Sequence, residues 1–147
     1  MAVFLLCPAK ASCTLHYGVA AALHWYSKQF SDRTGIATVL HLDEMDARLP
    51  SQEETALFRI AQEALINVAK YAHAKTVTLV LEEFEDSVRL TIADDGIGFD
   101  SRNDHQSGTK PKWGLINLKE RAQAVGGNLS VETGPGKGTS VIVEVPR

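Results

Sequence analysis

The sequence has few cysteines, no long apolar run and no excess of charge of one sign, and each absence excludes a class of protein. Cys7 and Cys13 are too few for a disulfide framework and match no metal-ligand spacing, so we interpret them as reduced intracellular thiols. No apolar run reaches the roughly 18 residues of a membrane span. The apolar start, Ala2 to Cys7, lacks a basic flank and is too short for a signal peptide. These absences predict a soluble, cytoplasmic chain without membrane contact.

The charge balance excludes a second class, proteins that bind nucleic acid through a basic surface. The chain carries 15 basic and 18 acidic residues, a formal net charge of −3, and they form no basic block. Its 147 residues fit a single domain, since domains average about 150 residues. We expect residues 1–50 to supply a linker, a helix and an edge strand, and residues 51–147 to form the core of that domain.

Apolar periodicity predicts the helices and strands. Apolar residues at three- and four-residue spacing predict helices over 17–30, 51–73 and 115–125. Ser51 and Glu54 match a capping box at the start of the second helix. Strands are predicted over 36–42 and around 77–81, 88–92, 129–131 and 141–145. Because the alternation leaves one face polar, we expect an α+β fold: a two-layer α/β sandwich whose mixed, mostly antiparallel sheet is covered by helices on one face.

Residues 100–112 match no helix or strand. This segment contains no large apolar side chain. Structureless loops of this length in a compact domain are usually either functional lids or disordered. The motifs on both sides favour a lid.

A D-x-G-x-G motif, Asp94 to Gly98, precedes this lid. Gly96 and Gly98 let the backbone turn sharply and let a ligand approach it closely. The Asp94 carboxylate can accept a hydrogen bond from an amino group such as that of adenine. We interpret its neighbour Asp95 as a solvated turn residue.

Two further glycine motifs follow the lid. Gly114 and Leu115 open a predicted helix, whose free N–H groups and dipole favour phosphate. Residues 134–139, GPGKGT, join the last two strands. They read as a hairpin loop, and their glycines and hydroxyl also suit the phosphate end of a pocket.

The predicted helix 51–73 carries a polar stripe. Glu63, Asn67 and Lys70 are four and three residues apart and so share one face, which Arg59 continues. Most such stripes are solvated helix faces. This one also suits Mg²⁺ with phosphates, because Mg²⁺ takes few protein ligands and these are oxygens, and a lysine provides a point charge for phosphate.

The order of these motifs resembles one family. It is similar to that of the ATP-binding catalytic domain of two-component sensor histidine kinases, which shares a wider fold with DNA gyrase, Hsp90 and MutL. The subclass that includes nitrate/nitrite sensors is the most similar. The stretches that carry the resemblance are FRIAQEALINVAKYAHA, ADDGIGFD, GLINLKERAQAVGG and GPGKGTSVIVEVP.

The resemblance implies an enzyme with ATP and Mg²⁺ as ligands. Glu63 and Asn67 would be the catalytic residues, Asn67 as a Mg²⁺ ligand and Glu63 in contact with Mg²⁺ or with water. Asp94 would accept from the adenine amine. The remaining implied ATP-binding residues are Lys70, Gly114 and Leu115 at the phosphates, Gly96 and Gly98 around the adenine, and Thr139 near the adenine or a bridging water.

The acceptor of the phosphoryl group is not recognisable in this sequence. In the subclass an acidic residue follows the acceptor histidine, and none of the five histidines here has one. Only His73, at the end of the predicted helix, and His105, in the lid, are candidates for contact with phosphate. We therefore expect the acceptor on a separate dimerisation domain of the parent kinase, with a response regulator as an indirect partner.

Three alternatives stay open at this point. Lys112 interrupts the expected glycine pattern, which favours a non-catalytic nucleotide-binding regulatory module. An anti-sigma-type serine kinase shares the fold, although residues 15–36 resemble the linker of histidine kinases. A gyrase-like ATPase would use Glu63 as a base.

Overall fold

The computed structural model describes residues 18–43, 49–98 and 111–147, and the side chains of the last range from residue 115 onward. In these ranges the helices are α3 (Val19–Thr34), α4 (Ser51–Asn67), the π-helix η1 (Val68–Ala72) and α6 (Pro111–Ala124). The strands are β1 (Ala37–Leu42), β2 (Thr76–Glu83), β3 (Ser87–Asp94), β4 (Asn128–Thr133) and β5 (Thr139–Pro146).

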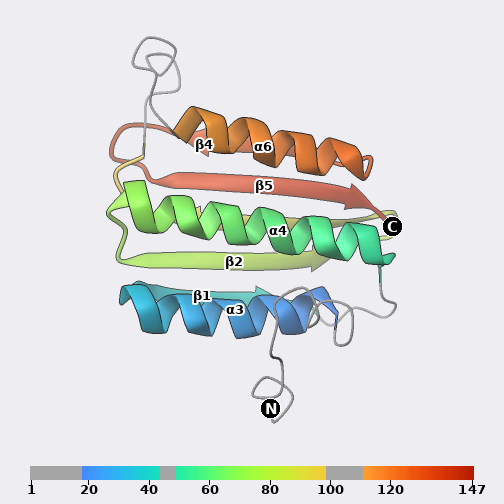
Figure 1. Ribbon diagram of the computed structural model, residues 1–147, viewed down its shortest axis with the longest axis horizontal. Coiled ribbons are helices and arrows are strands. Elements are labelled where there is room, and N and C mark those ends of the chain that lie inside the picture. Colours follow the sequence, from blue (N-terminus) through green and yellow to red (C-terminus); the bar gives the residue numbers. More distant parts are fainter. Residues whose placement is uncertain (1–17, 44–48, 99–110) are drawn as a thin grey trace.

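The strands form one sheet in the order β1-β2-β3-β5-β4. Strand β1 runs parallel to β2, and the other neighbouring pairs are antiparallel. Figure 1 shows the α-helices on the same face of this sheet, with α3 over β1, α4 across the centre and α6 over β4 and β5. The predicted two-layer α+β sandwich, with a mixed and mostly antiparallel sheet, is confirmed.

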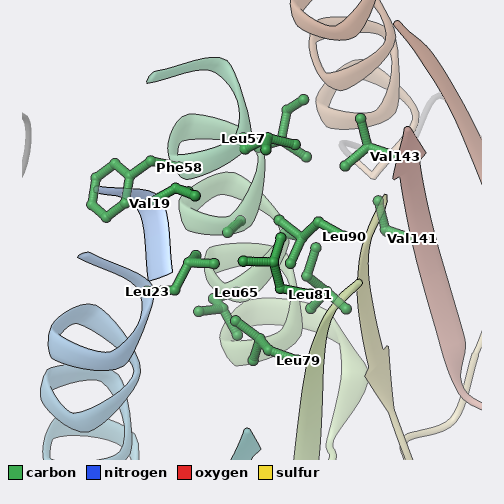
Figure 2. Packing of buried hydrophobic residues seen from close by; sticks show 14 of the residues in the cluster. Val19, Leu23, Leu57, Phe58, Leu65, Leu79, Leu81, Leu90, Val141 and Val143 are labelled. Atoms are coloured by element: carbon green, nitrogen blue, oxygen red, sulfur yellow. The ribbon is translucent and has the colours of Figure 1, made fainter. Parts of the chain in front are cut away.

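The core lies between α4 and the middle strands. Strands β2 and β3 bury every second residue, as the alternation predicts. In Figure 2, Leu81 and Leu90 of the sheet lie against Leu65 of α4, and all of them are fully buried. Burying each such leucine contributes about 1.5–3 kcal/mol. The rings of Tyr26 on α3 and Phe58 on α4 meet edge to face, 5.8 Å between centroids. Helix α3 therefore shares this core with α4.

The predicted capping box at the start of α4 is wrong. Ser51 is already helical, the cap position is Pro50, and no side-chain hydrogen bond caps the helix. Instead the N–H of Glu54 donates to the carbonyl oxygen of Pro50 at 3.1 Å. A residue inside the first turn cannot fold its side chain back as a cap does, because the capping residue must have a non-helical backbone.

Other boundaries also differ. Helix α3 continues past its last periodic residue, Phe30, and ends at Thr34-Gly35, where the sequence predicts a stop; Gly35 is left-handed and donates its N–H to the carbonyl oxygen of Ser31. Helix α6 begins at Pro111, four residues before the predicted start. Proline is favoured at the first helical position, where its missing N–H costs nothing. Within the described ranges, no helix has the length and apolar character needed to cross a membrane. The division of the domain at residue 50 stays a prediction.

Candidate nucleotide-binding site

The predicted site residues come from four segments at one end of the sheet, where the strands meet their connecting loops. These are the C-terminal end of α4 with η1, the loop after β3, the first turns of α6 and the turn between β4 and β5, which all lie at the left in Figure 1. Backbone contacts join three of them. Ile97 of the loop after β3 donates its N–H to the carbonyl oxygen of Ala72 at 2.8 Å and accepts the N–H of Gly136 at 2.6 Å. The D-x-G-x-G loop is therefore held between η1 and the β4–β5 turn.

Close backbone packing explains three of the glycines at this junction, among them Gly98, where an added Cβ atom would lie 2.1 Å from the carbonyl oxygen of Gly134. A Cβ atom on Gly96 would lie 2.1 Å from the carbonyl oxygen of Ala72. A Cβ atom on Gly138 would lie 2.1 Å from the carbonyl oxygen of Asp94, and Gly138 also has a φ of +71°. The nearest neighbour of each glycine is thus protein backbone. Packing alone accounts for these glycines, and approach of a ligand to them stays a prediction.

Asp94 is the last residue of β3 and lies at the centre of the junction. Its Oδ1 accepts the N–H of Gly96 at 2.8 Å. Desolvation raises the pKa of Asp94, and the charge of Asp95 adds to this, while hydrogen bonds from the N–H groups of Gly96 and Thr139 oppose it. Asp94 is thus a half-buried acceptor at the end of a central strand.

The interpretation of Asp95 as a solvated turn residue is only half right. The residue is exposed, yet its Oδ1 accepts the N–H groups of Lys75 at 2.9 Å and Thr76 at 3.0 Å. These two hydrogen bonds lower the pKa of Asp95. Asp95 therefore pins the start of β2 to the end of β3, beside the candidate site.

The polar stripe of α4 divides at Asn67. Glu63 and Asn67 are four residues apart in regular α-helix, so they share a face. Lys70 lies in the π-helix η1, where a turn is wider than in an α-helix, and it is exposed. Arg59 donates to Gln62 at 3.0 Å within the same helix. Regular α-helical spacing thus places Glu63 and Asn67 on one face, and a position of Lys70 on the same face stays a prediction.

Glu63 has a partner on α6 that the sequence analysis missed. Nε of Arg121 donates to its Oε1 at 2.8 Å. Helices α4 and α6 pack together and run in opposite directions in Figure 1. Asn67 follows Glu63 and Gly114 precedes Arg121 in these antiparallel helices. Asn67 and Gly114 therefore lie on the same side of the ion pair, toward the same end of the two helices.

Gly114 and Leu115 lie inside α6 rather than at its start. A helix leaves free the N–H groups of its first turn, whereas the N–H of Leu115 falls within the repeating pattern of a helix that begins at Pro111. A direct phosphate contact from the N–H of Leu115 would therefore require this turn to open. The predicted lid, 100–112, lies outside the described residues except for its last two, which are helical.

Thr139 begins β5 beside Asp94. Its hydroxyl lies 3.0 Å from that of Thr133, which also donates to the carbonyl oxygen of Gly138 at 3.1 Å. This pair of hydroxyls ties the two strands together at the base of the glycine turn. Thr139 thus reaches the junction through its backbone, and a contact with nucleotide stays a prediction.

His73 stands out among the histidines because its backbone is left-handed, with φ 52° and ψ 38°. It is exposed and ends η1, whereas His24 and His41 lie exposed on α3 and β1. His16 and His105 lie outside the described residues, so the prediction that His105 reaches phosphate does too.

The His73→Gly variant should be more stable than the wild-type chain by about 1 kcal/mol, because glycine adopts this conformation without strain. Urea unfolding measures the difference. His41→Gly, in the extended strand β1, is the matched control and should lose stability. A loss of stability in His73→Gly would contradict the strain that we assign to this position.

The side chains at this end of the sheet are too few to hold Mg²⁺ alone, and they fit Mg²⁺ that is also bound by the phosphates of a nucleotide. Among the described residues, no three histidine, cysteine or acidic side chains converge as a metal cluster would. Glu63 and Asn67 offer a carboxylate and an amide oxygen, the ligand type that Mg²⁺ prefers alongside phosphate oxygens.

Comparison with known proteins places this arrangement in a family. Residues 52–147 match the model of the histidine kinase-, DNA gyrase B- and HSP90-like ATPases. The oxygen sensor histidine kinase NreB of Staphylococcus carnosus is 36% identical over 129 residues, which cover 88% of this chain and 36% of NreB. The histidine-protein kinase/phosphatase DegS of Brevibacillus brevis is also 36% identical, over 32% of its length. The chain thus spans about a third of these relatives.

Solved structures agree on the fold. The histidine kinase domain of a blue-light activated kinase from Erythrobacter litoralis superposes with a TM-score of 0.71 at 22% identity, over 87% of this chain and 60% of that one. The histidine kinase AdeS of Acinetobacter baumannii gives 0.67 at 13% identity, over 99% and 76%. The resemblance seen in the sequence motifs is confirmed: the chain belongs to the family of histidine kinase-, DNA gyrase B- and HSP90-like ATPases.

Proposed function

We propose that the chain binds Mg–ATP at this end of the sheet and donates the γ-phosphoryl group to a histidine on a separate dimerisation domain. One observation carries the proposal. The half-buried acceptor Asp94 is joined, through the bond between Ile97 and Ala72, to the helix that bears Asn67 and Lys70. The proposed acceptor for adenine and the proposed ligands for phosphate and metal are thus linked by one set of hydrogen bonds. The family match and the histidine kinases among the relatives support this proposal.

The adenine end of the proposed site lies around Asp94. Its carboxylate accepts a hydrogen bond from the exocyclic amine, which selects adenine over guanine. Gly96 and Gly98 shape the pocket beside it. Thr139 lies near the adenine or near a water that bridges to it.

The phosphate end lies toward α4 and α6. Asn67 provides an amide oxygen for Mg²⁺, Glu63 a carboxylate for the metal or its water, and Lys70 a positive charge for the phosphates. Gly114 and Leu115 offer N–H groups, that of Leu115 once the first turn of α6 has opened. Mg²⁺ held by Asn67 and Glu63 would supply positive charge that neutralises the phosphates.

The transfer itself needs a partner. The imidazole nitrogen forms a bond to the γ-phosphorus while the bond to the β–γ bridging oxygen breaks, and ADP leaves with that electron pair. The imidazole proton passes to the acidic residue beside the acceptor histidine. The residues of this chain position the nucleotide, and a response regulator in the cytoplasm is the onward acceptor.

Calorimetric titration of ATP into the isolated chain, with and without Mg²⁺, tests the binding step. We expect one saturable site that tightens with Mg²⁺ and strongly prefers ATP to GTP. Absence of saturable binding would refute the proposal. Binding without transfer to any histidine would favour a nucleotide-regulated module, and transfer to a serine would favour an anti-sigma-type kinase.

A further inference from the structure

We propose that Arg121 is a positioning residue that holds the Glu63 carboxylate for its role at Mg²⁺. This inference rests on the proposed function, since it assigns the group that orients one of the proposed metal-side residues. It starts from the ion pair between α6 and α4, with 2.8 Å between Nε of Arg121 and Oε1 of Glu63. That distance is typical of a strong charge-assisted hydrogen bond.

The packing of both helices fixes where the two side chains begin. Arg121 directly precedes Ala122, and one turn earlier Leu118 is also fully buried in the core. Glu63 directly precedes Ala64, which is 3% exposed, and follows the fully buried Ile60 by three residues. Each charged side chain thus lies next to the buried face of its own helix. The pair therefore meets without either helix having to move.

The contact leaves Glu63 able to do more than bind Arg121. Within the described ranges, Oε1 takes the one hydrogen bond that Glu63 receives from a protein side chain, so Oε2 stays available as an acceptor. The Glu63 side chain is 27% exposed, so solvent and ligands reach it. With Oε1 held by Arg121, the carboxylate loses the rotational freedom that an exposed glutamate has. Oε2 can then face Mg²⁺ or its water from a fixed direction.

A rival explanation predicts the opposite effect of an Arg121 substitution on Mg²⁺ binding. If Arg121 competed with Mg²⁺ for the same carboxylate, removing its charge would strengthen metal binding. If only its positive charge mattered, lysine would replace it. A positioning role needs the planar guanidinium at this distance, and Lys cannot reproduce its geometry.

The test uses the whole chain and the fluorescent analogue TNP-ATP as the probe, titrated at increasing Mg²⁺ and again in excess EDTA. Arg121→Gln and Arg121→Lys should each raise the Mg²⁺ concentration for half-maximal tightening by about 10-fold or more, the usual effect of losing an orienting group behind a metal ligand. Affinity in EDTA should stay within about 2-fold. Lys119→Gln removes an exposed cation from the same helix and should behave as wild type.

A double-mutant cycle provides the stricter readout. Glu63→Gln should shift the Mg²⁺ requirement as Arg121→Gln does, and the double variant should be no worse than either single variant. Because both side chains are partly exposed, the melting temperature should change by less than about 4 °C.

Four results would overturn the inference. They are a Mg²⁺ requirement unchanged in Arg121→Gln, one that falls, full rescue by Arg121→Lys, and additive effects in the double variant. Each of these leaves nucleotide binding by the wild-type chain intact, so the inference fails and the proposed function stands. A wild-type chain that binds no nucleotide at all would instead refute the proposed function.

Discussion

The Asp94→Asn variant should bind ATP about 10- to 100-fold more weakly than the wild-type chain. The carboxylate is the proposed acceptor for the adenine amine, and a hydrogen bond to a charged group contributes about 1.5–3 kcal/mol. Asparagine keeps an oxygen that can accept the N–H of Gly96, so the local turn survives. Calorimetric titration with ATP measures the loss. Glu85→Gln, an exposed acid outside the junction, is the control and should bind as wild type.

The stability of this variant should move the other way. Folding raises the pKa of Asp94, so the folded chain holds the proton more tightly than the unfolded chain. Stability therefore falls as pH rises through that raised pKa, and ionised Asp94 costs stability at neutral pH. The asparagine side chain carries no charge and avoids this cost, so the variant should melt at the same temperature or higher at pH 7.

The same shift predicts a pH dependence of binding. ATP affinity should fall as pH drops through the raised pKa of Asp94, at a higher pH than an unperturbed carboxyl would show. The affinity of Asp94→Asn should not show this change. Wild-type affinity in Asp94→Asn, or weaker binding explained by unfolding, would contradict the role that we give Asp94.

The Gly138→Ala variant should be destabilised by about 2–5 kcal/mol and should lose nucleotide binding. Left-handed backbone costs a non-glycine residue about 1–2 kcal/mol, and forced overpacking adds about 1–3 kcal/mol. Both apply at Gly138, where φ is +71° and the new Cβ atom would meet the carbonyl oxygen of Asp94 at 2.1 Å. Denaturant unfolding and ATP titration measure the two losses.

Gly136 provides a matched control in the same turn. Its φ is +74°, but a Cβ atom added there would have no neighbouring atom within 4 Å. Gly136→Ala should therefore lose only about 1–2 kcal/mol and should still bind ATP. Equal losses in the two variants would mean that backbone strain alone, and not the contact with Asp94, limits this position.

The fold was predictable because its signals are local and repeated. The alternation in β2 and β3 places Leu79, Leu81 and Leu90 on one face of the sheet. The helical spacing in α4 places Leu57 and Leu65 on one face of the helix. Both patterns describe the same buried layer from its two sides. One local rule misled, since Ser51 matches a capping motif but lies inside the helix that Pro50 caps.

The details of the site were less predictable because they depend on contacts between distant segments. The ion pair of Glu63 with Arg121 joins residues 58 apart in the chain, and no spacing rule indicates it. The carboxylate of Asp95 binds N–H groups 19 and 20 residues away, which makes an exposed turn residue structural. The π-helix that carries Lys70 also has no signature in the residue pattern. Proline at the start of α6 was a usable signal, since Pro111 marks the first helical position.

Phosphotransfer tests the central claim most directly. The chain is mixed with ATP labelled in the γ-phosphate, Mg²⁺, and the histidine-bearing part of the Staphylococcus carnosus oxygen sensor kinase as a separate acceptor. We predict label on the acceptor that is lost in acid and stable in base, as phosphohistidine is, that needs Mg²⁺, and that falls at least about 10-fold with Asp94→Asn. Saturable ATP binding without any label on the acceptor, at a protein concentration where the two parts associate, would contradict the account.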